Sequence, residues 1–184
     1  MAAPVPATFY AGQRWRAADV NSQIRDNLSW AIAGKTCRAV RDGAYGIPNG
    51  LATLTAIPFN TEDFDPMGWH PTTGLTNIIL PDIEGYYAVS GNVEFVANAT
   101  GVRKAFIRAR TYNAGPYLMA SQTAPGIGVG ANDQTSLSVS TIVYLNGSTD
   151  YVELVLSQNS GTNPLSTTVA NMNTSLSLTL IGTV

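Results

Sequence analysis

The sequence predicts a mainly β fold in which antiparallel strands form a sandwich or a barrel. Apolar side chains recur at every second position in five runs, at residues 85–97, 104–110, 136–145, 150–156 and 175–182. A period of two is typical of strands that bury one face, because successive side chains point to opposite sides of a sheet. Short segments rich in Gly, Asn and Ser separate several of these runs. This spacing indicates strands that are joined by tight turns and pair in antiparallel fashion.

One face of each run provides the predicted core. Its members are Tyr87, Val89, Val93, Phe95, Ala105, Ile107, Ala109, Leu137, Val139, Val143, Leu145, Val152, Leu154, Leu156, Leu176, Leu178 and Leu180. Outward positions carry hydroxyl groups instead of charges, at Ser136, Ser138, Ser140, Ser175, Ser177 and Thr179. Charged residues make up only 12% of the chain, where about 25% is usual. We therefore expect neighbouring subunits to cover part of the sheets, although a hydroxyl-rich strand surface without such cover also fits this composition.

The N-terminal segment is predicted to be separate from the strands. Pro4 and Pro6 oppose a helix, so the first residues are expected to be extended. Residues 16–33 are the best helical candidate, and one apolar stripe follows their spacing at Val20, Ile24, Leu28 and Ala31. A short helix with one stripe is not stable alone, so it must pack on the β-domain, on a neighbouring copy or on a host assembly. We expect an arm and helix at 1–37 and a β-domain at 38–184, with a first β-stretch at 51–59.

The charge balance argues against capture of nucleic acid. The formal net charge is −2 and the chain has no basic block, so the attraction that dominates nucleic-acid binding is weak. Arg108 and Arg110 are expected on the strand face opposite Ile107 and Ala109, as part of a solvated or intersubunit surface. The single cysteine, Cys37, excludes an internal disulfide and a cysteine-based zinc site.

Residues able to carry chemistry are sparse. The one histidine, His70, has no partners at the spacing that a zinc site or a nucleophilic triad needs, so it is expected to be structural or solvated. Glu62, Asp63 and Asp65 form the densest acidic cluster. We expect a polar loop that Phe64 anchors to the core, with calcium binding and glycoside hydrolysis as alternatives. The sequence therefore predicts neither a cofactor nor an enzymatic activity.

Several short motifs of the β-region follow a familiar order. An opening motif consists of Pro81, Gly85, Tyr86 and Tyr87, and a later hairpin carries Leu145, Asp150, Val152 and Leu154. In these features residues 38–184 resemble the trimeric jelly-roll heads of complement-type globular domains and tumour-necrosis-factor-like ligands. The last strand departs from that pattern, because 180–182 read Leu-Ile-Gly where an aromatic-Ser-Gly sequence is usual. The resemblance implies an antiparallel jelly-roll sandwich, preceded here by a short extended arm and helix, and a homotrimer.

The N-terminal segment resembles a different set of proteins. Its matching residues are Gly12, Ala17, Ala18, Asn21, Arg25, Asp26 and Asn27. They are similar to the short segment that opens many phage tail-tip, fibre and other virion proteins. Arg16 stands where a capping Thr or Ser is common, which weakens the expected helix N-cap. The resemblance implies that this segment attaches the chain to a virion, with Trp15, Val20, Ile24 and Leu28 as the attachment residues.

Together these features predict a non-enzymatic structural protein of a phage particle, a trimeric fibre or tail-tip component that displays a jelly-roll head for host attachment. A capsid-decoration or head-fibre trimer is the first alternative, a carbohydrate-binding or carbohydrate-degrading module the second, and a soluble trimeric ligand of host origin the third. Expected partners are other copies of the chain, other virion proteins of tail, neck or capsid, and a glycan or protein of the host surface.

Any recognition surface is expected in the loops 61–74, 113–134 and 158–173, because loops vary on a rigid sandwich. Four residues of these loops suit a partly apolar contact: Trp69, His70, Tyr117 and Met119. The N-terminus lacks the pattern of a signal peptide, and no apolar run approaches the ~20 residues of a membrane span. We therefore expect a protein that is made in the host cytoplasm, does not insert into a membrane and resides in the virion.

Overall fold

The computed structural model describes residues 10, 14, 16–26, 28, 34–111, 114–127, 133–162, 164–168 and 172–184. The larger sheet consists of β1 (Thr36–Arg41), β4 (Thr61–Phe64), β5 (Glu84–Phe95), β8 (Thr135–Asn146) and β11 (Thr174–Gly182). The smaller sheet consists of β3 (Thr55–Ala56), β6 (Val102–Thr111), β7 (Ala114–Pro125) and β9 (Tyr151–Gln158). The remaining elements are the pair β2 (Gly46–Ile47) and β10 (Leu165–Ser166), the helix α1 (Ala17–Val20) and the π-helix η1 (Asn21–Asp26).

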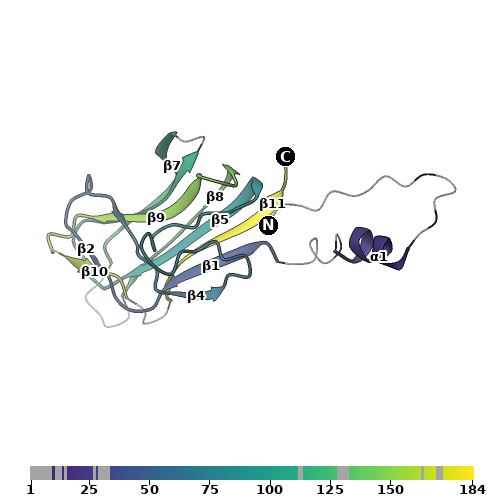
Figure 1. The fold of residues 1–184 in the computed structure, drawn as a ribbon. Coiled ribbons are helices and arrows are strands. Elements are labelled where there is room, and N and C mark those ends of the chain that lie inside the picture. Colours follow the sequence, from purple (N-terminus) through teal and green to yellow (C-terminus); the bar gives the residue numbers. More distant parts are fainter. Residues whose placement is uncertain are drawn as a thin grey trace.

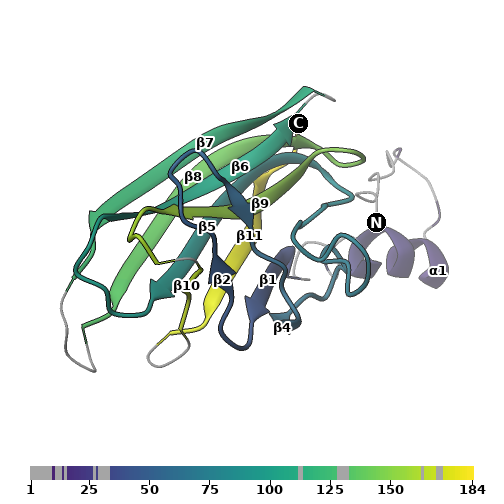
Figure 2. The same ribbon diagram turned by 90° about the vertical axis from the view of Figure 1, so that its left-hand side faces the viewer.

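The two sheets pack face to face as a sandwich (Figures 1 and 2). The five-stranded sheet has the order β4-β1-β11-β5-β8, and the four-stranded sheet has the order β3-β9-β6-β7. Every ladder between these strands is antiparallel. The first and last long strands, β1 and β11, lie side by side within the larger sheet. The predicted mainly β, antiparallel architecture is confirmed.

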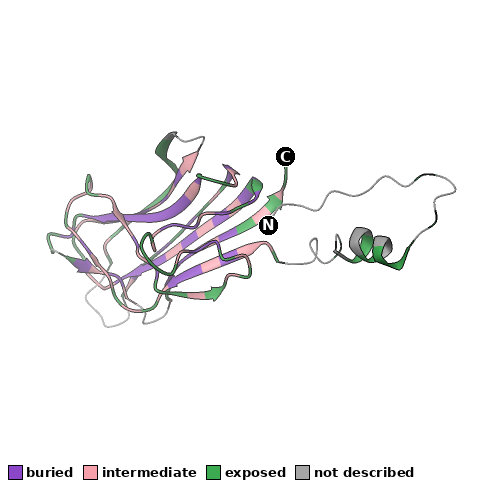
Figure 3. Cartoon of the chain, in the orientation of Figure 1, coloured by how far each residue is buried: buried purple, intermediate pink, exposed green. Residues whose placement is uncertain are grey.

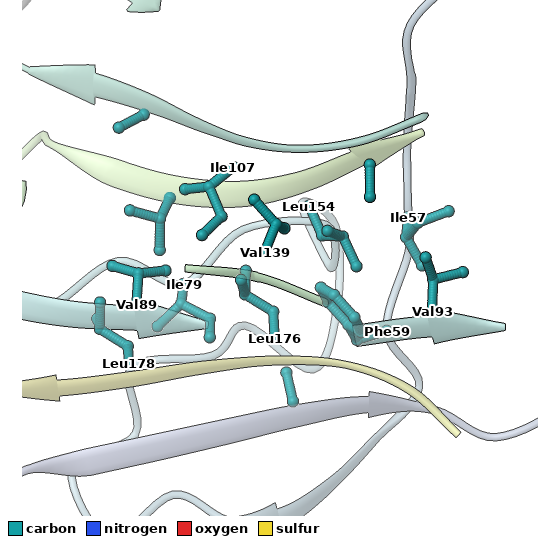
Figure 4. Packing of buried hydrophobic residues seen from close by; sticks show 14 of the residues in the cluster. Ile57, Phe59, Ile79, Val89, Val93, Ile107, Val139, Leu154, Leu176 and Leu178 are labelled. Atoms are coloured by element: carbon teal, nitrogen blue, oxygen red, sulfur yellow. The ribbon is translucent and has the colours of Figure 1, made fainter. Parts of the chain in front are cut away.

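The core lies between the sheets, and the alternating residues supply most of it. Figure 4 shows Val89 and Leu176 of the five-stranded sheet facing Ile107 and Leu154 of the four-stranded sheet. All the predicted core residues are buried except Leu180, which is half-buried. Connections between strands add large apolar side chains that the alternation did not predict, among them Ile47, Ile57, Phe59, Trp69 and Ile79.

The turn between β8 and β9 shows how the sequence joins two strands. Asn146 Oδ1 accepts hydrogen bonds from the amides of Ser148, Thr149 and Asp150, which closes the turn. Gly147 has a φ of 67°, and a Cβ there would lie 2.5 Å from the backbone nitrogen of Glu84. Only glycine combines this left-handed backbone with such a close approach. The predicted turn at 146–150 is present, but it is not a hairpin turn, because β8 and β9 lie in different sheets and the turn carries the chain from one sheet to the other.

Three expectations about elements are wrong. Residues 36–41 form β1 in the larger sheet, so Thr36 and Cys37 belong to a strand and not to the predicted N-terminal arm at 1–37. The stretch 51–59 contains only the two-residue strand β3. Residues 114–125 form the edge strand β7 instead of part of a loop.

The expected helix at 16–33 is only partly represented among the described residues. It begins as α1 and continues as the π-helix η1, and Leu28 is helical as well. Arg16 occupies the N-cap position and makes no capping hydrogen bond with its side chain, as its residue type predicts. No helix among the described residues is long and apolar enough to span a membrane.

Candidate functional site

The outer surface of the larger sheet carries few charges on strands β5, β8 and β11, whereas Arg38 of β1 and Asp63 of β4 form an ion pair elsewhere in the same sheet. We call the outward side chains of its strands β5, β8 and β11 the neutral face, whose central members are Ala88, Ser90, Ser140, Ile142, Ser177 and Thr179. The charged residues of these strands are Glu84 and Glu94, which lie near the two ends of β5. The central members of the neutral face line a shallow depression of about 390 Å³. A surface of this kind can be covered without stripping water from ions.

Apolar groups accompany the hydroxyl groups of the neutral face. Ile142 and Ile181 are exposed there. Tyr86 lies edge-to-face against Tyr144 with ring centroids 5.7 Å apart, and the Tyr144 hydroxyl donates a hydrogen bond to Glu84. Exposed aliphatic and aromatic side chains without surrounding charges are typical of surfaces that pack against protein. The neutral face is therefore the first candidate interaction surface.

The N-terminal part of strand β7 is a second exposed apolar site. Tyr117, Leu118 and Met119 are consecutive and have exposed fractions of 53%, 50% and 38%. A register shift between Ile107 and Arg108 falls opposite this triplet, so neighbouring side chains depart from strict alternation. Figure 3 shows the exposed end of β7 at the upper rim of the sandwich. Tyr117 and Met119 thus lie on a strand and not in a loop, and their role in recognition stays a prediction.

Strand β6 carries a row of basic residues on its outer side. We call Lys104, Phe106, Arg108 and Arg110 the basic row; all four are half-buried and alternate with the core residues of the same strand. The predicted position of Arg108 and Arg110, opposite Ile107 and Ala109, is confirmed.

One member of the basic row has a carboxylate partner. Arg108 Nε lies 2.6 Å from Glu153 Oε1, and Asn77 Nδ2 donates to the other oxygen of Glu153 at 2.9 Å. Glu153 is buried because the chain between β4 and β5 reaches over β9 at this point. The nearby Arg103 is different, since it is fully buried and donates to the carbonyl oxygens of Thr100 and Asn98. Burial lowers the pKa of Arg103. Its two hydrogen bonds hold the loop at 98–100 against the start of β6.

The histidine of the chain lies inside the fold. His70 Nδ1 is 2.7 Å from Glu62 Oε1, and Nε2 is 3.0 Å from the carbonyl oxygen of Thr76. Both ring nitrogens of His70 therefore lie within hydrogen-bond distance of an oxygen. The backbone amide of His70 donates to Asp65 Oδ2 at 2.7 Å, and the ring packs edge-on against Phe59. These contacts fasten the segment after β4 to the sandwich.

Trp69 is buried beside His70. Its indole Nε1 donates to Asp82 Oδ1 at 2.8 Å, and its ring meets Tyr87 edge-to-face at 5.6 Å. The sequence predicts that Trp69 and His70 lie in a recognition loop; the structure instead buries both. The physical reason is that each finds an internal hydrogen-bond partner, which removes the cost of burying its polar nitrogen. These two residues therefore do not share a surface with Tyr117 and Met119.

The acidic residues that could serve hydrolysis or calcium binding have separate partners. Glu62 faces His70, Asp65 accepts the backbone amide of His70, and Asp63 pairs with Arg38 at 3.2 Å. Among the described residues no group of three or more His, Cys, Asp and Glu side chains is placed to hold a metal ion. Phe64, the expected anchor of this loop, is exposed and belongs to β4. The arrangement is that of residues that hold a segment in place.

The lone cysteine is poorly suited to nucleophilic chemistry. Cys37 is fully buried on the inner side of β1. Burial raises the pKa of its thiol, and the nearby carboxylates of Asp65 and Glu62 raise it further. A thiol held in its neutral form is a weak nucleophile. Cys37 therefore acts as a small core residue.

The expected attachment residues are only partly described. Ile24 and Leu28 have exposed fractions of 52% and 56%. Trp15 lies outside the described residues, and so does the side chain of Val20. Helix α1 lies beyond the end of the sandwich in Figure 1. The apolar groups of Ile24 and Leu28 are thus open to a partner.

Comparison with known proteins identifies the fold. No protein-family model matches the chain, and no curated protein matches it either. The structure of the Eiger TNF from S. frugiperda aligns with 82% of this chain and 94% of its own, with a TM-score of 0.58 and 11% identity. Murine APRIL at pH 5.0 aligns with 80% of this chain and 99% of its own, with a TM-score of 0.59 and 10% identity.

This chain has a tumour-necrosis-factor-like jelly-roll fold. The jelly-roll sandwich that the sequence predicts is thereby confirmed. Identities near 10% speak for the fold and not for the function, because one fold serves many functions.

Two exposed apolar residues are absent from the predicted recognition site. Leu118 belongs to the exposed triplet of β7, and Ile142 belongs to the neutral face. The signal for Ile142 was present, because it stands among the outward positions of a strand whose other face is apolar. Leu118 gave no such signal, since its strand lacks regular alternation.

Proposed function

We propose that this chain is a non-enzymatic structural protein of a bacteriophage particle, a homotrimer that attaches through its N-terminal segment and displays its jelly roll to the host surface. The neutral face is the observation that supports the formation of a trimer. The resemblance of residues 12–27 to virion attachment segments carries the phage context. The fold supplies a rigid scaffold for display.

The neutral face supports trimer formation through its chemistry. It joins Ile142, Ile181 and the Tyr86 ring to a field of serine and threonine hydroxyl groups. Burial of such a surface against other copies gains the hydrophobic contribution and leaves the hydroxyl groups able to bond with each other or with trapped water. The jelly-roll heads that the sequence resembles are trimeric, and three copies that meet at this face would also explain the low charge of the chain.

The N-terminal segment supports attachment to a larger assembly. Ile24 and Leu28 expose apolar side chains from a short helical segment. A helix of this length gains its stability from packing and not from its own hydrogen bonds. A virion protein that covers these two side chains would order the segment and anchor the trimer.

A non-enzymatic role agrees with the site geometry. His70, Glu62 and Asp65 hold each other in place, and Cys37 is a buried neutral thiol. The function of the protein would then come from multivalent display, in which three weak sites on one trimer gain avidity.

Two measurements test this proposal. Mass photometry of the purified full chain should report three chains per particle, and a stable monomer at micromolar concentration would contradict the trimer. Electron microscopy of phage particles labelled with an antibody against the chain should place the label on the virion. Label on the tail or fibres supports host attachment, whereas a regular label over the capsid shell supports the decoration alternative.

A further inference from the structure

The basic row on β6 is a built surface that the trimer does not use. Lys104, Arg108 and Arg110 project from one side of a strand that has neighbours on both sides, β9 and β7. The strand rise places Arg108 and Arg110 about 6.6 Å apart and Lys104 about 13 Å from Arg108. The row belongs to the smaller sheet, on the opposite side of the sandwich from the neutral face. Trimerisation through the neutral face therefore leaves the row open.

The positive charge of the row is only partly neutralised. Glu153 is paired with Arg108. Across the ladders, Lys104 faces Ser157 and Thr123, and Arg110 faces Tyr151. Among the described residues, neither Lys104 nor Arg110 forms an ion pair. Three cations against one carboxylate form a local positive surface on a protein whose net charge is −2.

Aromatic and apolar groups are interleaved with these cations. Phe106 lies between Lys104 and Arg108 on the same side of the strand, and Tyr151 lies directly opposite Arg110. Both rings are half-buried, so each keeps part of its surface in contact with solvent. A ring with a cation beside it suits a sugar that carries an acidic group, because the ring packs on the apolar face of the sugar while the cation pairs with the acid.

The spacing of the cations favours a glycan over nucleic acid. Double-stranded DNA carries one charge per ~1.7 Å of axis, and proteins that bind it usually contribute many phosphate contacts. The basic row offers few cations that are several ångströms apart, with a carboxylate among them. A polysaccharide with one acidic group per sugar or per repeat matches this sparse charge better.

We propose that the basic row binds an acidic glycan, a polysaccharide that bears carboxylate, sulfate or phosphate groups. Lys104 and Arg110 pair with the acidic groups, and Phe106 and Tyr151 contact the sugar rings. This inference deepens the proposed function, on which it rests for its biological setting: it names the chemical class of the host-surface ligand. A trimer would present three such rows on its outside.

The test uses the purified full chain and two polymers of equal length, dextran sulfate and uncharged dextran. Binding is measured at low and at moderate salt. The variant Lys104→Gln/Arg110→Gln should bind dextran sulfate about tenfold more weakly at low salt and show a shallower salt dependence. The matched control Arg14→Gln/Arg16→Gln removes the same charge from two exposed residues of the arm and should bind as the parent does.

Three results would overturn the glycan site. Equal losses in both double variants would mean that net charge alone governs binding. Equal binding of the uncharged polymer would remove the role of the acidic groups. Tighter binding of duplex DNA than of dextran sulfate, lost in the same variant, would assign the row to nucleic acid. Failure of the proposed function is distinguishable, because a monomer that is absent from virions but keeps the Lys104/Arg110-dependent binding supports the site and contradicts the phage trimer.

Discussion

The two outer faces of the sandwich differ although both sheets share one core. The neutral face of the larger sheet presents hydroxyl groups and Ile142, and it holds a shallow depression. The outer side of the smaller sheet presents the basic row. Glu153, which pairs with Arg108, is buried there beneath the chain that leads to β5. Both faces arise from the same two-residue period, so they differ in the residues at outward positions and in the chain segment that covers the outer side of β9. One face suits contact with protein, and the other suits a charged ligand.

The connection between β4 and β5 ties the two faces into one body. From this connection Trp69 packs against Tyr87 of β5, and Asn77 bonds to Glu153 of β9. The largest loss of stability should therefore come from a substitution that loosens this connection. The variant Trp69→Ala is expected to lose about 3–5 kcal/mol of the free energy of unfolding, because it leaves a cavity and removes the indole hydrogen bond to Asp82. Denaturant unfolding measures this loss.

Tyr117→Ala is the matched control for that variant. It removes an aromatic ring that is about half exposed, so it should change the unfolding free energy by less than about 0.5 kcal/mol. Similar losses in the two variants would show that Trp69 does not connect the sheets in the way its contacts indicate.

The second prediction concerns a charge introduced into the neutral face. Ile142→Asp places a charge at the centre of the face that we assign to the trimer, and burying that charge should cost about 2 kcal/mol or more per interface. This corresponds to an association roughly 30-fold weaker, which mass photometry at micromolar concentration would show as monomer. Leu118→Asp adds the same charge at an exposed position of β7 and should leave a trimer. Dissociation in the Leu118 variant alone would move the interface to the other sheet.

The sequence predicts the strands that alternate and therefore most of the core. It does not reveal β1, because its inward residues Cys37 and Ala39 are small and give a weak apolar signal. It does not reveal β7 either, since Gly115 and Pro116 at its start resemble a turn and no regular alternation follows. These strands exist because neighbouring strands complete their hydrogen bonds, which is tertiary information.

The same limit applies to the candidate site. The basic row follows from alternation, so the outward position of Arg108 and Arg110 could be predicted. The burial of Trp69 and His70 could not, because it depends on Asp82 and on the carbonyl oxygen of Thr76 being in place. A histidine or tryptophan in a polar segment looks exposed until the segment folds back on the sandwich.

The third prediction concerns the basic row and removes the carboxylate that pairs with Arg108. Glu153→Gln keeps the shape of the side chain but takes the counter-charge from Arg108, whose Nε lies 2.6 Å away. We expect a loss of about 1–2 kcal/mol in unfolding free energy and severalfold tighter binding of dextran sulfate, since a third cation becomes available. The exposed pair of Arg38 and Asp63 provides the control: Asp63→Asn should change stability by less than about 0.5 kcal/mol and leave the binding unchanged. Weaker binding in the Glu153 variant would mean that the carboxylate positions Arg108 for the ligand.

The last and smallest predicted effect concerns the interior that both faces share. Burial raises the pKa of Cys37 in the folded chain, whereas the unfolded thiol ionises near pH 8.5. The contribution of this thiol to stability is therefore complete below that pH and is lost as the pH rises, because only the unfolded chain releases the proton. Between pH 8 and pH 9.5 the loss should be about 1 kcal/mol. Denaturant unfolding of the parent and of Cys37→Ala at both pH values measures it, and the variant should show the smaller decrease. Tyr87, whose pKa burial also raises, remains in both proteins and adds its own loss only above about pH 10. Equal decreases in the two proteins would mean that the Cys37 thiol ionises as readily in the fold as in the unfolded chain, which a fully buried residue on the inner side of β1 should not do.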